Sequence, residues 1–132
     1  MPFVIDASVA ACWLLPDEQH SIADLAFERI ARDPAIAPAI WWYELRNLLI
    51  VSERRGGLDS ANTARALQLL RDLPVTIDNA LEEEKLLDLA RRRQLSVYDA
   101  AYLELALRTG YPLATLDRAL SAAARAEAAD LI

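Results

Sequence analysis

Cysteine, histidine and glycine are scarce in this sequence, and their scarcity excludes several kinds of site. Cys12 is the only cysteine, so no disulfide can form within the chain. His20 is the only histidine, so a zinc site built from cysteine and histidine has too few ligands. The three glycines form neither of the glycine-rich loops that hold phosphates in nucleotide-binding proteins. A functional site must therefore draw mainly on other side chains.

Long apolar runs and a surplus of basic charge are also missing. The longest apolar stretches, such as residues 35–43, are far too short to span a membrane. Met1 leads directly into an apolar segment rather than into a charged leader, so we expect a cytoplasmic protein with no membrane partner. The net charge of −6 argues against broad, nonspecific binding of nucleic acid.

What the sequence does have is a regular alternation of short apolar segments and amphipathic stretches. Its 132 residues are typical of one domain. Strands are predicted at 3–6, 35–37, 75–77 and 113–115, with a possible edge strand at 130–132. Helices are predicted at 7–15, 18–32, 39–55, 59–72, 80–93 (capped by Asn79), 97–109 and 117–126. This order predicts a single α/β domain over residues 1–132, in which helices cover both faces of a parallel sheet of about four to five short strands.

Four acidic residues lie where predicted elements begin or end. Asp6 and Asp117 directly follow apolar strands, whereas Glu44 and Asp99 lie near the starts of helices. In a parallel α/β domain, the carboxyl ends of strands and the starts of the following helices meet at one edge of the sheet. Carboxylate oxygens are the ligands that Mg²⁺ and Mn²⁺ prefer. The four positions therefore predict an acidic site for a divalent cation.

Each of these acids also has an ordinary structural interpretation. Asp6 and Asp117 could simply cap the helices that follow them. Ser96 and Asp99 have the spacing of a capping box, and Glu44 could be a solvated helix residue. Taken together, however, four clustered carboxylates would repel one another unless one is protonated or a cation lies between them.

Three polar residues lie close to these acids in the sequence. Ser8 and Thr115 are each two residues from a strand-end acid, where a hydroxyl can orient a carboxylate or a metal-bound water. Asn47 lies three residues after Glu44, on the same predicted helix face, and could steady that carboxylate or contact a phosphate. We take all three as supporting residues of the predicted site.

Four segments of the sequence resemble the PIN-domain ribonucleases, and specifically the VapC-type toxins of toxin–antitoxin systems. The matching segments are residues 4–9, 42–49, 95–102 and 113–117. They occur in the family's order from one end of the chain to the other. The resemblance implies a single α/β/α domain, a homodimer and a metal-dependent endoribonuclease that acts on RNA. It also implies a cognate antitoxin whose C-terminal segment lies in a groove of the toxin.

The resemblance also implies roles for individual residues. Mg²⁺, or Mn²⁺, would be bound by Asp6, Asp99 and Asp117. Glu44 would complete the acidic quartet, directly or through water, with Ser8 and Thr115 in support. Hydrolysis of the phosphodiester would leave a 5′-phosphate and a 3′-hydroxyl.

The main alternative is a non-catalytic PIN-like module that binds RNA or a protein partner, which the intact quartet argues against. A phosphoacceptor receiver domain fits poorly, because it needs paired acids after the first strand, where Asp6 stands alone. Two further features have ordinary interpretations. We expect residues 41–43 to be core or dimer contacts, and the arginines at 91–93 to complement the end of a helix.

Overall fold

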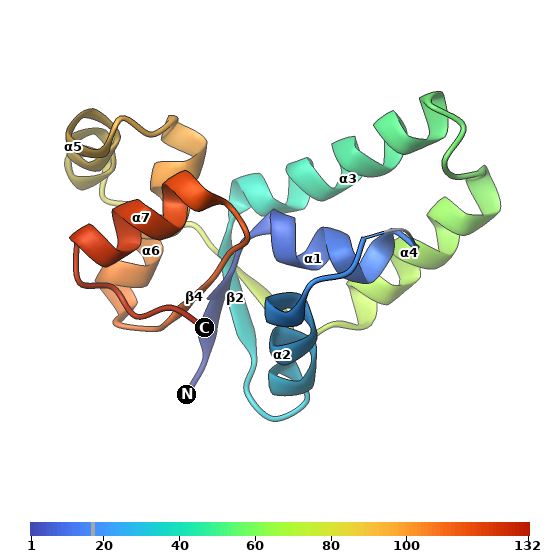
Figure 1. The fold of residues 1–132 in the computed structure, drawn as a ribbon, viewed down its shortest axis with the longest axis horizontal. Helices are drawn as coiled ribbons and strands as arrows, with labels where there is room; N and C mark the ends of the chain where they lie inside the picture. The colour runs from blue at the N-terminus through green and yellow to red at the C-terminus, as the bar shows by residue number, and fades with distance from the viewer. Residues whose placement is uncertain (17) are drawn as a thin grey trace.

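A four-stranded parallel sheet forms the centre of the computed structural model, which describes residues 1–16 and 18–132 (Figure 1). The strands of the described residues are β1 (Phe3–Ile5), β2 (Ala35–Pro38), β3 (Val75–Asp78) and β4 (Leu113–Ala114). They lie in the order β3-β2-β1-β4, and every neighbouring pair is parallel. The three residues of β1 are fully buried, as expected for a central strand covered on both faces.

Helices cover both faces of the sheet. One group consists of α1 (Ala7–Leu14), α2 (Ser21–Ile30), α3 (Ala39–Arg54) and α4 (Ser60–Asp72), and the other of α5 (Glu83–Arg93), α6 (Val97–Thr109) and α7 (Arg118–Ala126). Figure 1 shows the two groups on opposite sides of the strands. The predicted α/β architecture is therefore confirmed. Within the described residues, no helix combines the length and the apolar character needed to cross a lipid bilayer.

Two predicted helix starts are wrong. The second helix begins at Ser21 rather than at residue 18. The His20 side chain caps it there, because its imidazole accepts a 3.1 Å hydrogen bond from the Ile22 amide. Residue 17 lies outside the described residues. The fifth helix begins at Glu83, so Asn79 does not cap it. Asp78 instead holds this segment in a turn, since its carboxylate accepts a 2.9 Å hydrogen bond from the Ala80 amide.

The predicted edge strand at the end of the chain is reduced to a single bridge. Leu131 pairs with Leu113 in parallel, and the amides of Leu113 and Ile132 complete the contact with bonds of 2.8 and 3.0 Å to Asp130 and Leu113 carbonyls. This short pairing still covers the edge of β4, which would otherwise present unpaired backbone groups.

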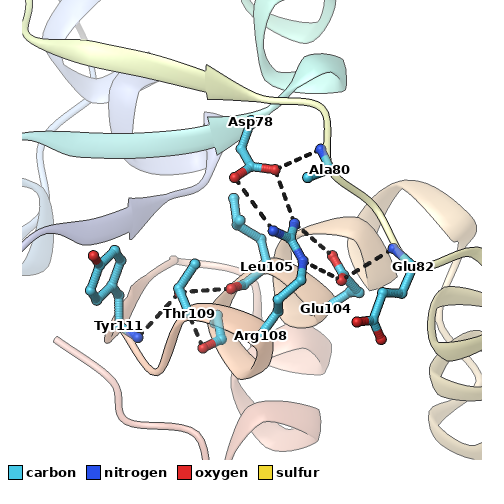
Figure 2. Close-up of polar contacts among 9 residues, drawn as sticks. Asp78, Ala80, Glu82, Glu104, Leu105, Arg108, Thr109 and Tyr111 are labelled. Carbon is cyan, nitrogen blue, oxygen red and sulfur yellow. Dashed lines mark hydrogen bonds and ion pairs between the residues drawn. The ribbon is translucent and has the colours of Figure 1, made fainter.

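A partly buried ion network joins the end of β3 to α6 (Figure 2). The Arg108 guanidinium donates to Glu104 at 2.7 Å and to Asp78 at 3.0 Å. Glu104 is fully buried and also accepts a 3.4 Å hydrogen bond from the Glu82 amide at the start of α5. A buried charge is tolerated only where such partners surround it. The network therefore fixes the segment between β3 and α5 against the helix that carries Asp99.

The register of β1 and β4 brings distant parts of the chain together at the carboxyl edge. Val4 pairs with Leu113 and Ile5 with Ala114. The amide of Asp6 then donates a 3.0 Å hydrogen bond to the Ala114 carbonyl. Asp6 and the residues that follow β4 are thus neighbours at the same edge of the sheet.

Candidate active site

Asp6 is a buried carboxylate held by two hydroxyl groups. The residue is only 5% exposed. Oδ2 accepts hydrogen bonds from Ser8 Oγ at 2.9 Å and from Thr115 Oγ1 at 2.5 Å. Oδ1 accepts a longer bond of 3.4 Å from the Ser8 amide, which caps α1. Asp6 therefore caps α1, while its place in a metal site stays a prediction.

Ser8 and Thr115 also hold the segment that carries Asp117. Ser8 Oγ accepts a 3.0 Å hydrogen bond from the Leu116 amide, and Thr115 Oγ1 accepts one of 3.1 Å from the Asp117 amide. Asp117 itself caps α7, since its Oδ1 accepts a 2.8 Å bond from the Leu120 amide. The two hydroxyls therefore link the ends of β1 and β4, and both lie where the sequence places supporting residues.

Glu44 reaches the same region from α3. It is half-buried, and its Oε1 accepts a 3.0 Å hydrogen bond from the hydroxyl of Tyr102 on α6. Burial, and then the charges of Asp6 and Asp99, raise the pKa of Glu44, while the Tyr102 hydrogen bond partly opposes them. Glu44 is therefore close enough to two other acids to interact with them electrostatically.

Asp99 lies in the first turn of α6, beyond the cap residue Ser96. The Asp99 amide donates a 3.0 Å hydrogen bond to Ser96 Oγ, which is one half of the predicted capping box. Burial, and then the charges of Asp117 and Asp6, raise the pKa of Asp99. These interactions, with those of Glu44, connect all four predicted acids.

The chemistry of this cluster suits a hard divalent cation. Burial is the main cause of the raised pKa of Asp6, despite the hydroxyls that oppose it. Buried carboxylates that repel one another gain most from a cation placed between them. In the described part of the chain, no three histidine, cysteine or acidic side chains already stand close enough to form a finished metal site. The residues that would hold the ion are Asp6, Asp99 and Asp117, whose carboxylate oxygens are the kind of ligand that Mg²⁺ prefers.

Comparison with known proteins identifies the family. The model of the PIN domain family matches residues 3–126. The chain belongs to the PIN-domain family. It is 33% identical to Ribonuclease VapC3 of Pyrobaculum aerophilum over 124 residues, covering 92% of this chain and 93% of the relative. It is also 35% identical to Ribonuclease VapC3 of Mycobacterium tuberculosis over 120 residues, covering 91% and 85%.

Solved structures share the PIN fold. A protein from Pyrobaculum aerophilum matches with a TM-score of 0.74 at 24% identity, covering 93% of this chain and 84% of that one. The VapC20 toxin of Mycobacterium tuberculosis, described as cleaving the sarcin–ricin loop, matches at 0.64 and 18% identity, covering 92% and 94%. A chain of a toxin–antitoxin complex from Klebsiella pneumoniae matches at 0.55 and 19% identity, covering 84% and 82%. At these identities the likeness concerns the fold alone.

Asn47 is the one predicted supporting residue of this PIN domain that the structure does not bring to an acid. Its side chain is exposed on α3, and among the described residues no hydrogen bond joins it to Glu44. The spacing of three residues places the two on neighbouring positions of the helix, but the partner of Glu44 is the Tyr102 hydroxyl. A contact between Asn47 and an RNA phosphate stays a prediction.

The aromatic cluster of this PIN domain is partly buried and partly exposed, and its basic cluster forms ion pairs. Trp41 is buried, whereas Trp42 and Tyr43 are exposed beside Glu44. Arg92 and Arg93 both pair with Glu127 just after α7, with the Arg92 contact at 2.6 Å. These arginines lie at the end of α5, where the sequence predicts that they complement the helix. They also join α5 to the residue that follows α7 by ion pairs.

Tyr102 is the residue of the site that sequence reasoning missed. Its only signal is its position three residues after Asp99, which places both side chains on one face of α6. Its partner Glu44 is 58 residues away in the chain. Nothing in the local sequence of either residue predicts that contact.

Proposed function

We propose that this PIN domain is a metal-dependent endoribonuclease and the toxin of a toxin–antitoxin pair. The observation that carries the proposal is the hydrogen-bonded link between Asp6 and the segment of Asp117, which Ser8 and Thr115 make. Glu44 on α3 and Asp99 on α6 lie in the same region, since the charge of Asp6 adds to burial in raising the pKa of both. The VapC ribonucleases that are at least 33% identical over nearly the whole chain support the same activity. The alternative, a non-catalytic module, would not need buried carboxylates that repel one another.

The proposed mechanism assigns a task to each acidic residue. Asp6, Asp99 and Asp117 would hold Mg²⁺ or Mn²⁺, and Glu44 would complete the site directly or through water. When bound, the cation supplies an activated water and offsets the charge that develops on the phosphate oxygens. Ser8 and Thr115 orient the Asp6 carboxylate by the hydrogen bonds they donate to Oδ2. RNA would bind along the carboxyl edge of the sheet, with the scissile phosphate beside these acids.

The proposal includes two protein partners. The first is a cognate antitoxin, in keeping with the Klebsiella toxin–antitoxin complex that shares this fold. The second is another copy of this chain in a homodimer. The exposed apolar side chains of Trp42, Tyr43 and Ile50 on α3 are suited to such a contact.

An RNA cleavage assay on antitoxin-free protein tests the activity and its site together. We expect cleavage with Mg²⁺ or Mn²⁺ and none with chelator. Asp99→Asn should lower the rate by roughly two orders of magnitude or more, since it removes a preorganised charge at the reacting phosphate. The RNA panel should include transfer RNAs and ribosomal fragments, and light scattering on the same preparation gives the oligomeric state.

Asp88→Asn is the matched control, because the same chemical change falls on an exposed residue of α5 that pairs with Arg92. A folded Asp99→Asn variant with full activity would contradict the assignment of the site. Wild-type protein that cuts none of the RNAs and binds no divalent cation would favour the non-catalytic alternative.

A further inference from the structure

Tyr102 is a buried tyrosine whose hydroxyl lies inside the acidic site. The residue is 0% exposed and is the largest fully buried side chain of the described residues. Buried phenols are stable when the ring packs in the core and the hydroxyl finds a polar partner. Here the partner is Glu44, whose Oε1 accepts the hydroxyl at 3.0 Å.

The contact is distinctive because Glu44 has so few partners. Among the described residues, no other side chain or backbone amide donates a hydrogen bond to its carboxylate. Asp6, by contrast, is held by the hydroxyls of Ser8 and Thr115. Among the described residues, the Tyr102 hydroxyl is therefore the group that orients this carboxylate.

The Tyr102 hydroxyl also lies within the influence of two acidic side chains. Burial, and then the negative charges of Glu44 and Asp6, raise the pKa of Tyr102 far above its usual value, and the backbone of Ala7 acts in the opposite direction. The hydrogen bond of the Tyr102 hydroxyl joins α6, which carries Asp99, to α3, which carries Glu44.

We propose that Tyr102 is a positioning residue, whose hydroxyl fixes Glu44 toward Asp6 and Asp99 and so sets the affinity of the acidic site for a divalent cation. The inference rests on the proposed function, since it assumes that these acids bind the cation. A partner that orients a carboxylate of a metal site commonly changes metal affinity by about 10–100-fold when it is removed.

Tyr102→Phe removes the hydroxyl and keeps the ring that packs in the core. We expect the dissociation constant for Mn²⁺, measured by calorimetry without RNA, to rise about tenfold, which corresponds to about 1.4 kcal/mol. Tyr98→Phe is the matched control, because it removes the same hydroxyl from a tyrosine of the same helix. Tyr98 is 62% exposed. Its Mn²⁺ affinity should equal that of the wild type.

A second background separates positioning from a purely structural role. If Tyr102 acts through Glu44, Tyr102→Phe should change Mn²⁺ affinity less than twofold when Glu44→Ala is already present, because that variant has no side-chain acceptor for the hydroxyl. An unchanged affinity in the single variant, or a tenfold loss that persists in the Glu44→Ala background, would overturn the proposal. Wild-type protein that binds Mn²⁺ but cleaves no RNA would refute the nuclease alone, whereas wild-type protein that binds no Mn²⁺ would refute both.

Discussion

Asp6 is a buried acidic residue, and two hydroxyl groups stabilise its carboxylate. Thr115 Oγ1 lies 2.5 Å and Ser8 Oγ 2.9 Å from its Oδ2. Removing a donor leaves a buried carboxylate partly unsatisfied, which costs more than the hydrogen bond itself contributes. These hydroxyls were predicted as supporting residues, because they lie two positions from acids at strand ends. Their shared contact with Asp6, which joins residues 109 positions apart, was not predictable from spacing.

Thr115→Val replaces the hydroxyl by a methyl group of similar size. We expect it to lower the free energy of unfolding by about 1–3 kcal/mol at neutral pH, because Asp6 loses its shortest hydrogen bond. Urea denaturation in the presence of chelator measures the change without any contribution from a bound cation. Thr115→Ser, which keeps the donor, should recover most of the loss.

Thr63→Val is a control for the same chemical change, since the buried Thr63 hydroxyl has no partner among the described residues. Its stability should equal or exceed that of the wild type. Equal destabilisation by the two valine substitutions would show that the Asp6 contact contributes nothing specific.

The helices of this domain differ in how well the local sequence predicts them. The helix α6 was predicted with both ends correct, because Ser96 caps its start and Gly110 adopts the left-handed conformation after its end. The start of α5 was predicted wrongly, because it depends on contacts with residues outside the segment. The Glu82 amide contacts Glu104, which lies 22 residues further along the chain. Capping signals predict an element well only where the cap is local.

The helices α1, α2 and α4 also enclose a groove, which we expect to receive the antitoxin. Its apolar lining includes Trp13, Leu58 and Leu69, and a neighbouring hollow exposes Phe27, which is 48% exposed and packs edge-on against Trp13. A groove whose lining combines polar and apolar side chains can bind an amphipathic segment of a partner. One face of such a peptide would contact the lining of the groove, and its other face would remain in water.

Phe27→Glu should weaken the binding of the cognate antitoxin at least tenfold, because it places a charge where an apolar side chain would be buried. Calorimetric titration of the toxin variant with purified antitoxin measures the effect. Leu81→Glu makes the same kind of change at an exposed position outside the groove and should leave the affinity unaltered. Comparable weakening by both variants would argue that the antitoxin binds elsewhere.

For the whole molecule, gathering four acids at one edge has a cost when no cation is present. The α/β order and the positions of the acids were predictable, because the strands are short apolar segments and parallel strands share their carboxyl edge. The mutual distances were not, because they depend on strand register and on contacts such as that of Tyr102. Burial is the main cause of the raised pKa values of Asp6, Glu44 and Asp99, and the charges of neighbouring acids add to it at Glu44 and Asp99. The folded state therefore disfavours these charged carboxylates.

Asp99→Asn should therefore stabilise the metal-free protein while abolishing its activity. At pH 7.5 in chelator we expect the melting temperature to rise by about 3–5 °C, the shift expected for ~1 kcal/mol in a chain of this size. Because folding raises the pKa of Asp99 above 3.8, the wild type loses stability relative to the variant as pH rises from that value through the folded pKa. The gap between the two proteins should accordingly close as pH falls toward 3.8.

Adding Mn²⁺ should reverse the order of the two proteins, because the wild type binds the cation more tightly and is stabilised by it. Thermal unfolding followed by circular dichroism, across pH and with or without Mn²⁺, gives both results. A variant less stable than the wild type in chelator at pH 7.5 would contradict the claim that the acids repel one another.

The strand order β3-β2-β1-β4 has a consequence for the timing of folding. The strand beside β1 at the acidic edge is β4, and the contact between Asp6 and Thr115 spans 109 residues. Loops of that length close late, because contacts between distant residues carry a large entropic cost until the intervening chain is ordered. A chain that is still being synthesised therefore has no assembled acidic site, and any nuclease activity must wait until β4 has left the ribosome and paired with β1.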